Sequence, residues 1–113
     1  IFDNQAYGSN GGGMFIYGGT VTVMDTNIYS NTATYGGGMY IYGGTVTVTN
    51  TNVFSNTAEY GGYGSEGGGV VISGGTVSFD GCNIHNNEAD GAFPNIIVHS
   101  SAIACAFPTP WTD

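Results

Sequence analysis

Residues 11–33 have the sequence GGGMFIYGGTVTVMDTNIYSNTA, and this stretch decides the fold because the chain repeats it twice more. The second copy, residues 36–58, is GGGMYIYGGTVTVTNTNVFSNTA, and the third, residues 67–89, is GGGVVISGGTVSFDGCNIHNNEA. The three copies align without an internal gap, and 20 residues separate the first glycine from the last asparagine in each. Such a fixed block is typical of a solenoid, in which each unit stacks on the next.

The connection between one block and the next varies in length. Measured from asparagine to glycine triplet, it takes seven residues from Asn4 to Gly11, five from Asn31 to Gly36 and eleven from Asn56 to Gly67. Only a loop that points away from the stack can change length freely. We therefore expect one corner of the fold to carry insertions.

Within a block, apolar and polar residues alternate with period two, as in residues 14–17, MFIY, and 20–23, TVTV, which predicts strands rather than helices. A third short strand contains Ile28, Val53 or Ile84 between asparagines. Strands this short must pair in parallel with the same strand of the next unit. The sequence predicts an all-β, right-handed parallel β-helix (β-solenoid) of about four rungs, each with three short strands.

The alternation also predicts which residues stack in the core. Three inward columns are expected: Met14, Met39 and Val70; Ile16, Ile41 and Ile72; Val21, Val46 and Val77. Asparagine recurs at two corners, in the sets Asn4, Asn31, Asn56 and Asn87, and Asn27, Asn52 and Asn83. Stacked about 4.8 Å apart, side-chain amides can donate and accept along a column and satisfy buried polar groups. We interpret both sets as structural asparagine ladders rather than catalytic sites.

The glycine-glycine turns and the strands that end in asparagine, as in NIYSN, NVFSN and NIHNN, resemble repeats of chlamydial polymorphic membrane proteins. Related repeats occur in large secreted β-helix proteins of the pectin-lyase-like kind. The resemblance covers residues 1 to about 92. It implies a right-handed β-helix displayed at a cell surface, often with an adhesive role.

We expect two parts in the chain. Residues 1–92 form the repeats, with an incomplete first rung and units that start at residues 11, 36 and 67; residues 93–113 form a degenerate last rung and a C-terminal cap or linker. An incomplete first rung exposes unpaired strand edges. Either the rest of a larger chain covers that edge, or another subunit docks there head to tail. The chain opens on Ile1, so we expect a processed product or an excised piece.

The composition of the chain narrows the classes of partner that it is expected to bind. The chain has eight acidic residues, no lysine, no arginine and a net charge of −8, which disfavours nucleic acid and anionic membrane surfaces. Its longest apolar runs, such as residues 96–98, fall far short of the roughly 18 residues that a membrane span needs. Two cysteines, Cys82 and Cys105, favour a secreted or cell-surface setting. A disulfide between them would contribute about 3 kcal/mol; two buried free thiols are the alternative.

Two outward faces are candidates for binding. If Met14 and Ile16 point inward, Phe15, Tyr17, Tyr40 and Tyr42 point outward and form an aromatic patch. Exposed aromatic patches are typical of protein interfaces and sugar-stacking platforms. Alternatively, the tail or the corner loop 59–66 covers this patch. The next wall is a grid of hydroxyls: Thr20, Thr22, Thr45, Thr47, Thr76 and Ser78. This grid resembles the T-x-T array of ice-binding β-solenoids, although threonine is also simply a favourable exposed strand residue.

Catalysis finds little support in the sequence. Asp25 and Asp80 are expected in one column with Asn50 between them, about 9.5 Å apart, at the upper limit for inverting glycosidases, but all three are ordinary turn residues. His85 and His99 lack zinc-site spacing, and His85 aligns with the aromatic Tyr29 and Phe54.

We therefore expect no enzyme activity, no metal and no cofactor. The sequence favours an extracellular structural or adhesive β-helix, a subunit or segment of a filament, sheath or surface appendage. Its expected partners are itself, head to tail or laterally, or other cell-surface components. The alternative is a binding module for glycan or ice.

Overall fold

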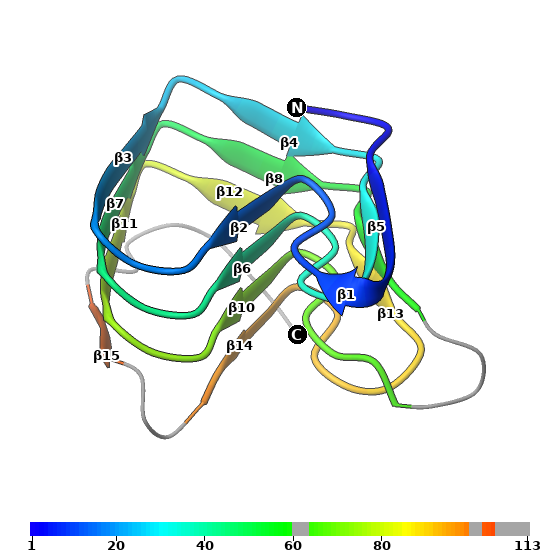
Figure 1. The fold of residues 1–113 in the computed structure, drawn as a ribbon. Helices are drawn as coiled ribbons and strands as arrows, with labels where there is room; N and C mark the ends of the chain where they lie inside the picture. The colour runs from blue at the N-terminus through cyan, green and yellow to red at the C-terminus, as the bar shows by residue number, and fades with distance from the viewer. Residues whose placement is uncertain (60–63, 100–102, 106–113) are drawn as a thin grey trace.

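The computed structural model describes residues 1–59, 64–99 and 103–105, the last three by their backbone alone, and these residues form fifteen strands in four parallel sheets. We name each sheet after its first strand (Figure 1). The β1 sheet joins β1 (Gln5–Asn10), β5 (Thr32–Tyr35), β9 (Thr57–Ala58) and β13 (Glu88–Ala89). The β2 sheet joins β2 (Met14–Ile16), β6 (Met39–Ile41), β10 (Val70–Ile72) and β14 (Ile96–Val98). The β3 sheet joins β3 (Thr20–Met24), β7 (Thr45–Thr49), β11 (Thr76–Asp80) and β15 (Ile103–Cys105). The β4 sheet joins β4 (Asn27–Tyr29), β8 (Asn52–Phe54) and β12 (Asn83–His85).

Each full rung therefore has four strands, and the predicted number of three per rung is wrong. The additional strand lies in the β1 sheet, directly after the corner asparagine, where the sequence suggested only a loop. It forms because its alanines stack from rung to rung: Ala33 pairs with Ala58, and both are fully buried. A two-residue strand such as β9 is too short for any alternation to be visible in the sequence.

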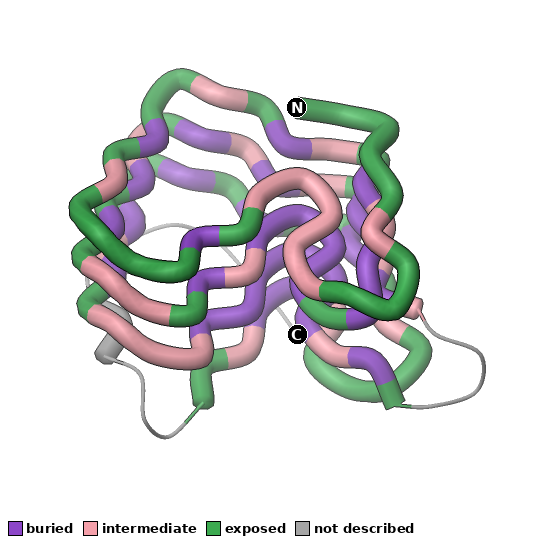
Figure 2. The backbone as a smooth tube through the Cα atoms, viewed as in Figure 1, coloured by how far each residue is buried: buried purple, intermediate pink, exposed green. Residues whose placement is uncertain are grey.

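The core runs along the axis of the stack, and its columns follow the predicted register (Figure 2). Met14, Met39 and Val70 are aligned, and β14 extends their column. The middle rungs are completely enclosed, as Met39 shows with 0% exposure, whereas Met14 at the end of the stack is only partly buried. Each enclosed aliphatic side chain contributes about 1.5–3 kcal/mol relative to an exposed one.

The glycine triplet forms the corner between the β1 and β2 sheets, and its third glycine is needed for space. A Cβ atom there would clash with the carbonyl oxygen of the equivalent residue in the next rung, and it would also lie 2.7–3.0 Å from a ladder amide nitrogen. The distances to Nδ2 are 2.9 Å for Gly13 and Asn31, 3.0 Å for Gly38 and Asn56, and 2.7 Å for Gly69 and Asn87. The glycine therefore makes room both for the backbone of the next rung and for the asparagine beside it.

The last rung replaces this triplet by Phe93-Pro94-Asn95. Phe93 takes up the left-handed conformation of the first glycine, with φ of 56° against 63° at Gly67. Bulky residues rarely adopt this conformation, so the turn is strained at Phe93. Beyond it, β14 and β15 continue the β2 and β3 sheets. Of the predicted degenerate rung and cap or linker at residues 93–113, residues 100–102 and 106–113 lie outside the described residues.

At the other end, the incomplete first rung consists of residues 1–10. The terminal amine of Ile1 donates to the carbonyl oxygen of Asn27 at 2.9 Å, and Phe2 bridges to Tyr29, so this segment lies along β4. The chain then forms β1 against β5. In the described part of the chain, no helix is long and apolar enough to cross a membrane.

Candidate interaction surfaces

A continuous amide ladder runs through the corner between the β4 and β1 sheets. Each Oδ1 atom accepts two hydrogen bonds from the preceding rung, one from the backbone N–H and one from the side-chain Nδ2. Asn31 donates both to Asn56, at 3.0 Å each, and Asn56 donates both to Asn87, at 2.9 and 3.0 Å. Asn4 donates to Asn31 in the same way. Because Asn31 and Asn56 have 0% exposure, this ladder satisfies polar groups that water cannot reach. The predicted structural role is confirmed.

The ladder has a fifth member that the sequence did not reveal. Asn95 accepts both hydrogen bonds of Asn87, at 3.1 and 3.0 Å. It follows Asn87 by only eight residues, because it occupies the position of the third triplet glycine in the last rung rather than the position of Asn87. The substitution of glycine by asparagine at that position was the available signal, because its side chain can enter the space that the glycine keeps open.

The second asparagine set also forms a column, but an exposed one on the outside of the β4 sheet. Asn52 donates from Nδ2 to Asn27 Oδ1 at 2.8 Å, and Asn83 donates to Asn52 at 3.4 Å. The expectation that this set satisfies buried groups is wrong, since Asn27 and Asn83 are exposed to solvent. Water can replace these hydrogen bonds, so they contribute little to stability.

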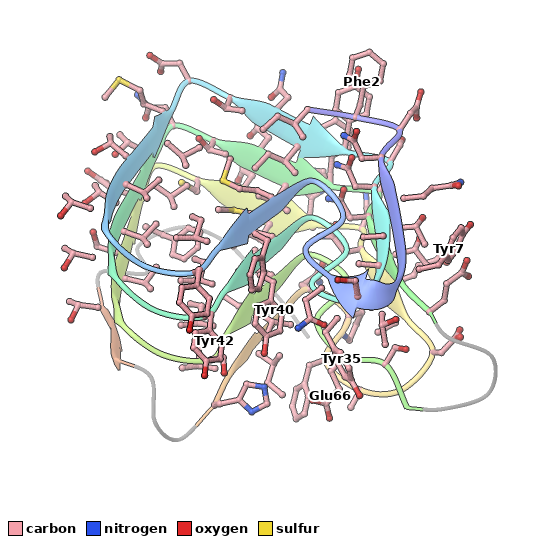
Figure 3. The ribbon with its side chains drawn as sticks, in the orientation of Figure 1. Phe2, Tyr7, Tyr35, Tyr40, Tyr42 and Glu66 are labelled. Carbon is pink, nitrogen blue, oxygen red and sulfur yellow. The ribbon has the colours of Figure 1, made fainter. Side chains whose placement is uncertain are left out.

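The predicted aromatic patch exists as two columns on the outside of the β2 sheet (Figure 3). Phe15 is aligned with Tyr40, with ring centroids 5.5 Å apart and a tilt of 33°. Tyr17 and Tyr42 are stacked face to face, with centroids 5.0 Å apart and only 4° between the ring planes. Tyr17 is 72% and Tyr42 52% exposed. Residues 60–63 of the corner loop and residues 106–113 of the tail, the two segments expected as alternative covers, lie outside the described residues.

The column that begins with Phe15 and Tyr40 is accessible to solvent only in part. Val71 is aligned with Tyr40 in the next rung, yet it has 0% exposure. The backbone at Gly67 lies directly against it, since a Cβ there would clash with Val71 Cγ2. The exposed aromatic surface therefore belongs to the first two full rungs.

A second aromatic column lies on the β4 sheet. Tyr29, Phe54 and His85 stack in register, as expected, and Phe2 extends the column at the N-terminal end. Successive centroids are 5.1, 5.2 and 5.6 Å apart, and no pair of planes deviates by more than 10°. His85 thus continues an aromatic stack, and no metal-binding cluster is found among the described residues.

The threonine wall lies on the outside of the β3 sheet, next to the aromatic patch. Thr20, Thr45 and Thr76 are aligned in one column, and Thr22, Thr47 and Ser78 in the second. All five threonines are exposed. The register and the outward direction agree with the sequence prediction.

The structure does not support the predicted carboxylate pair or the predicted cysteine pair. The register pairs Met24, Thr49 and Asp80, so Asp25 and Asp80 do not share a column, and the carboxylate pair proposed for a glycosidase is wrong. Cys82 is a free, buried cysteine whose thiol donates to the carbonyl oxygen of Val48 at 3.3 Å, which favours the alternative of free thiols over the predicted disulfide. The backbone of Cys105 pairs with Ser78 rather than with Cys82. Its side chain lies outside the described residues.

Comparison with known proteins agrees with this geometry. The model of the right-handed β-helix region matches residues 1–106. No curated protein and no solved structure matches the chain. The closer resemblance to chlamydial polymorphic membrane proteins stays a prediction. Since the match spans nearly the whole chain and the sheets are parallel throughout, the chain belongs to the right-handed β-helix family.

Proposed function

We propose that this β-helix is an extracellular structural or adhesive element, a subunit or segment of a filament, sheath or surface appendage that acts without catalysis. The observation that carries the proposal is the pair of adjoining outer walls, the aromatic patch and the threonine wall, which repeat with the rung. Exposed and contiguous aromatic side chains are typical of binding surfaces rather than of idle surface.

The repeat favours a second copy of the chain as the partner. A surface with a period of one rung, about 4.8 Å, is complementary to another surface with the same period. In the Tyr17–Tyr42 column the ring faces are turned toward each other, so the ring edges point outward. Such edges can interdigitate with the side chains of a second wall, as in dry interfaces between sheets. A sugar ring would instead need a free aromatic face, which supports lateral self-association over glycan binding.

The negative charge of the chain makes this assembly dependent on salt concentration. Two copies with a net charge of −8 each repel one another, and the repulsion is screened over about 10 Å at 0.1 M salt. We expect association to increase with ionic strength. An assembly held by ion pairs between the copies would respond in the opposite direction.

Sedimentation velocity and negative-stain electron microscopy test the proposal, at several protein and salt concentrations. We expect polymers from the unaltered chain and mainly monomers from Tyr42→Ser. A matched control is Tyr7→Ser, which removes a tyrosine from β1 outside the two walls, with 61% exposure against 52% for Tyr42. Monomers under all conditions would refute assembly. Polymers from both variants would place the contacts at the ends of the stack rather than at the walls.

Ice binding is the second candidate, and the alignment of the threonine columns favours it. Thr22 and Thr47 lie in register and exposed, which gives hydroxyls and methyl groups a regular spacing. An ice binder acts as a monomer. Inhibition of ice recrystallisation that is lost in Thr47→Tyr but kept in Tyr42→Ser would favour this function over assembly through the aromatic patch.

A further inference from the structure

The stacked tyrosines suggest a second kind of chemistry for the outer surface. Tyr17 directly follows β2, and the backbone N–H of Tyr42 donates to the carbonyl oxygen of Ile16 at 2.8 Å, so the two residues are fixed in adjacent rungs. Their rings lie 5.0 Å apart and almost parallel. Both side chains extend into solvent, with 72% and 52% of their surface exposed. We propose that Tyr17 and Tyr42 form a modification site at which a peroxidase couples the two phenols to dityrosine.

Pairing of like rings distinguishes this site from the other aromatic contacts of the described residues. Phe15 lies tilted against Tyr40, and in the β4 sheet Tyr29 lies between Phe2 and Phe54. Each of those contacts joins a phenol to a ring that has no hydroxyl group. Coupling requires a phenoxyl radical on both partners. Among the ring contacts of the described residues, Tyr17–Tyr42 alone meets this requirement.

The reaction balances with hydrogen peroxide as the oxidant and a haem peroxidase as the catalyst. Each phenol loses one electron and one proton and becomes a phenoxyl radical. The two radicals combine through their ortho carbons, which forms one C–C bond, and each ortho hydrogen then moves to its oxygen to restore the phenol. Overall, two tyrosines and one hydrogen peroxide give one dityrosine and two waters.

The fold assists this reaction in two ways. Because both rings belong to one rigid stack, their effective concentration is on the order of millimolar or higher, so coupling within a molecule exceeds coupling between dilute molecules. Because the side chains are exposed, the rings can tilt out of the parallel arrangement into the twisted geometry of the product while the backbone stays in register. The product joins the first two full rungs covalently.

The test is oxidation of the full chain at micromolar concentration with hydrogen peroxide and a haem peroxidase, followed by dityrosine fluorescence and mass spectrometry. We expect a monomer that is two hydrogen atoms lighter, with a cross-linked peptide containing Tyr17 and Tyr42 after digestion with pepsin. Trypsin is unsuitable because the chain has no lysine or arginine. The yield per molecule should stay constant over an about tenfold dilution, since the reaction is intramolecular.

Matched variants decide the outcome. Tyr17→Phe and Tyr42→Phe keep the stack but remove one phenol, and each should reduce the monomeric product to background. Tyr7→Phe, at another exposed tyrosine, should leave the yield unchanged. Cross-links that fall on dilution, that persist in Tyr17→Phe, or that form equally well in denaturant would overturn the proposal. It stands independently of the proposed function, because it requires no self-association.

Discussion

Replacing Asn56 by alanine would remove the central amide of the buried ladder. Its Oδ1 atom accepts two hydrogen bonds from Asn31, both at 3.0 Å, and its Nδ2 atom donates to the carbonyl oxygen of Ile28 at 2.9 Å and to Asn87 at 3.0 Å. At about 1 kcal/mol for each of these hydrogen bonds, the expected loss is about 4 kcal/mol. The backbone N–H of Asn31 loses its acceptor in a region without access to water, which adds to the cost.

A loss of this size is a large part of the stability of a small domain, which is about 5–15 kcal/mol in total. The exposed ladder supplies the matched control. Asn52→Ala removes an amide of the same size whose partners lie at 2.8 and 3.4 Å, but water can replace them. We expect this variant to lose less than about 1 kcal/mol.

Equilibrium unfolding in urea, followed by far-ultraviolet circular dichroism, measures both variants against the unaltered chain. If the m-value is unchanged, the free energies of unfolding of the variants and the unaltered chain can be compared directly. If Asn56→Ala lost less than about 1 kcal/mol, or no more than Asn52→Ala, the inference that the buried ladder carries unreplaceable hydrogen bonds would be refuted.

Three further predictions concern the core and the corners. Gly38→Ala should destabilise the protein by about 3 kcal/mol or more, because its Cβ would meet three neighbouring atoms at 2.6–3.0 Å. Gly18→Ala, whose Cβ would meet nothing within 4 Å, should be neutral or slightly stabilising. Thermal unfolding compares the stability of the two variants. The thiol of Cys82 should resist alkylation in the folded state of a Cys105→Ser variant and react after unfolding, as mass spectrometry would detect; rapid reaction in the folded state would contradict its burial. Ile41→Ala, at a fully enclosed site, should cost about 2–5 kcal/mol in urea unfolding, and a cost below about 1 kcal/mol would contradict the packing.

The core was predictable because its signal is periodic. In-register stacking carries each apolar residue to the same place in the next rung, so the gapless repeats were sufficient to place Ile41 above Ile72 and Val46 above Val77. The same logic placed the outward threonines. By contrast, β9 has two residues, and no periodicity can be recognised over that length.

The candidate surfaces were predictable only in part. Periodicity tells on which side of a strand Tyr42 lies, but not that its ring stacks face to face on Tyr17, because ring tilt depends on packing between side chains. Asn95 was missed because it reaches the ladder from a different corner. The error at Asp80 arose from matching residue types, Asp with Asp, where the gapless alignment already paired Asp80 with Met24.

The variable corner has a consequence for how such a chain can diversify. Glu59 still donates its backbone N–H to the carbonyl oxygen of Ala33, and Glu66 again bridges to Tyr35, so the stacked arrangement holds on both sides of residues 60–63. Ser65, just before Glu66, already belongs to the fold, since it is fully buried and its carbonyl oxygen accepts a hydrogen bond from the backbone N–H of Gly91 at 2.9 Å. Because the number of residues at this corner differs from rung to rung, five from Asn31 to Gly36 and eleven from Asn56 to Gly67, a lineage could change its length while the stacked architecture stays under unchanged selection.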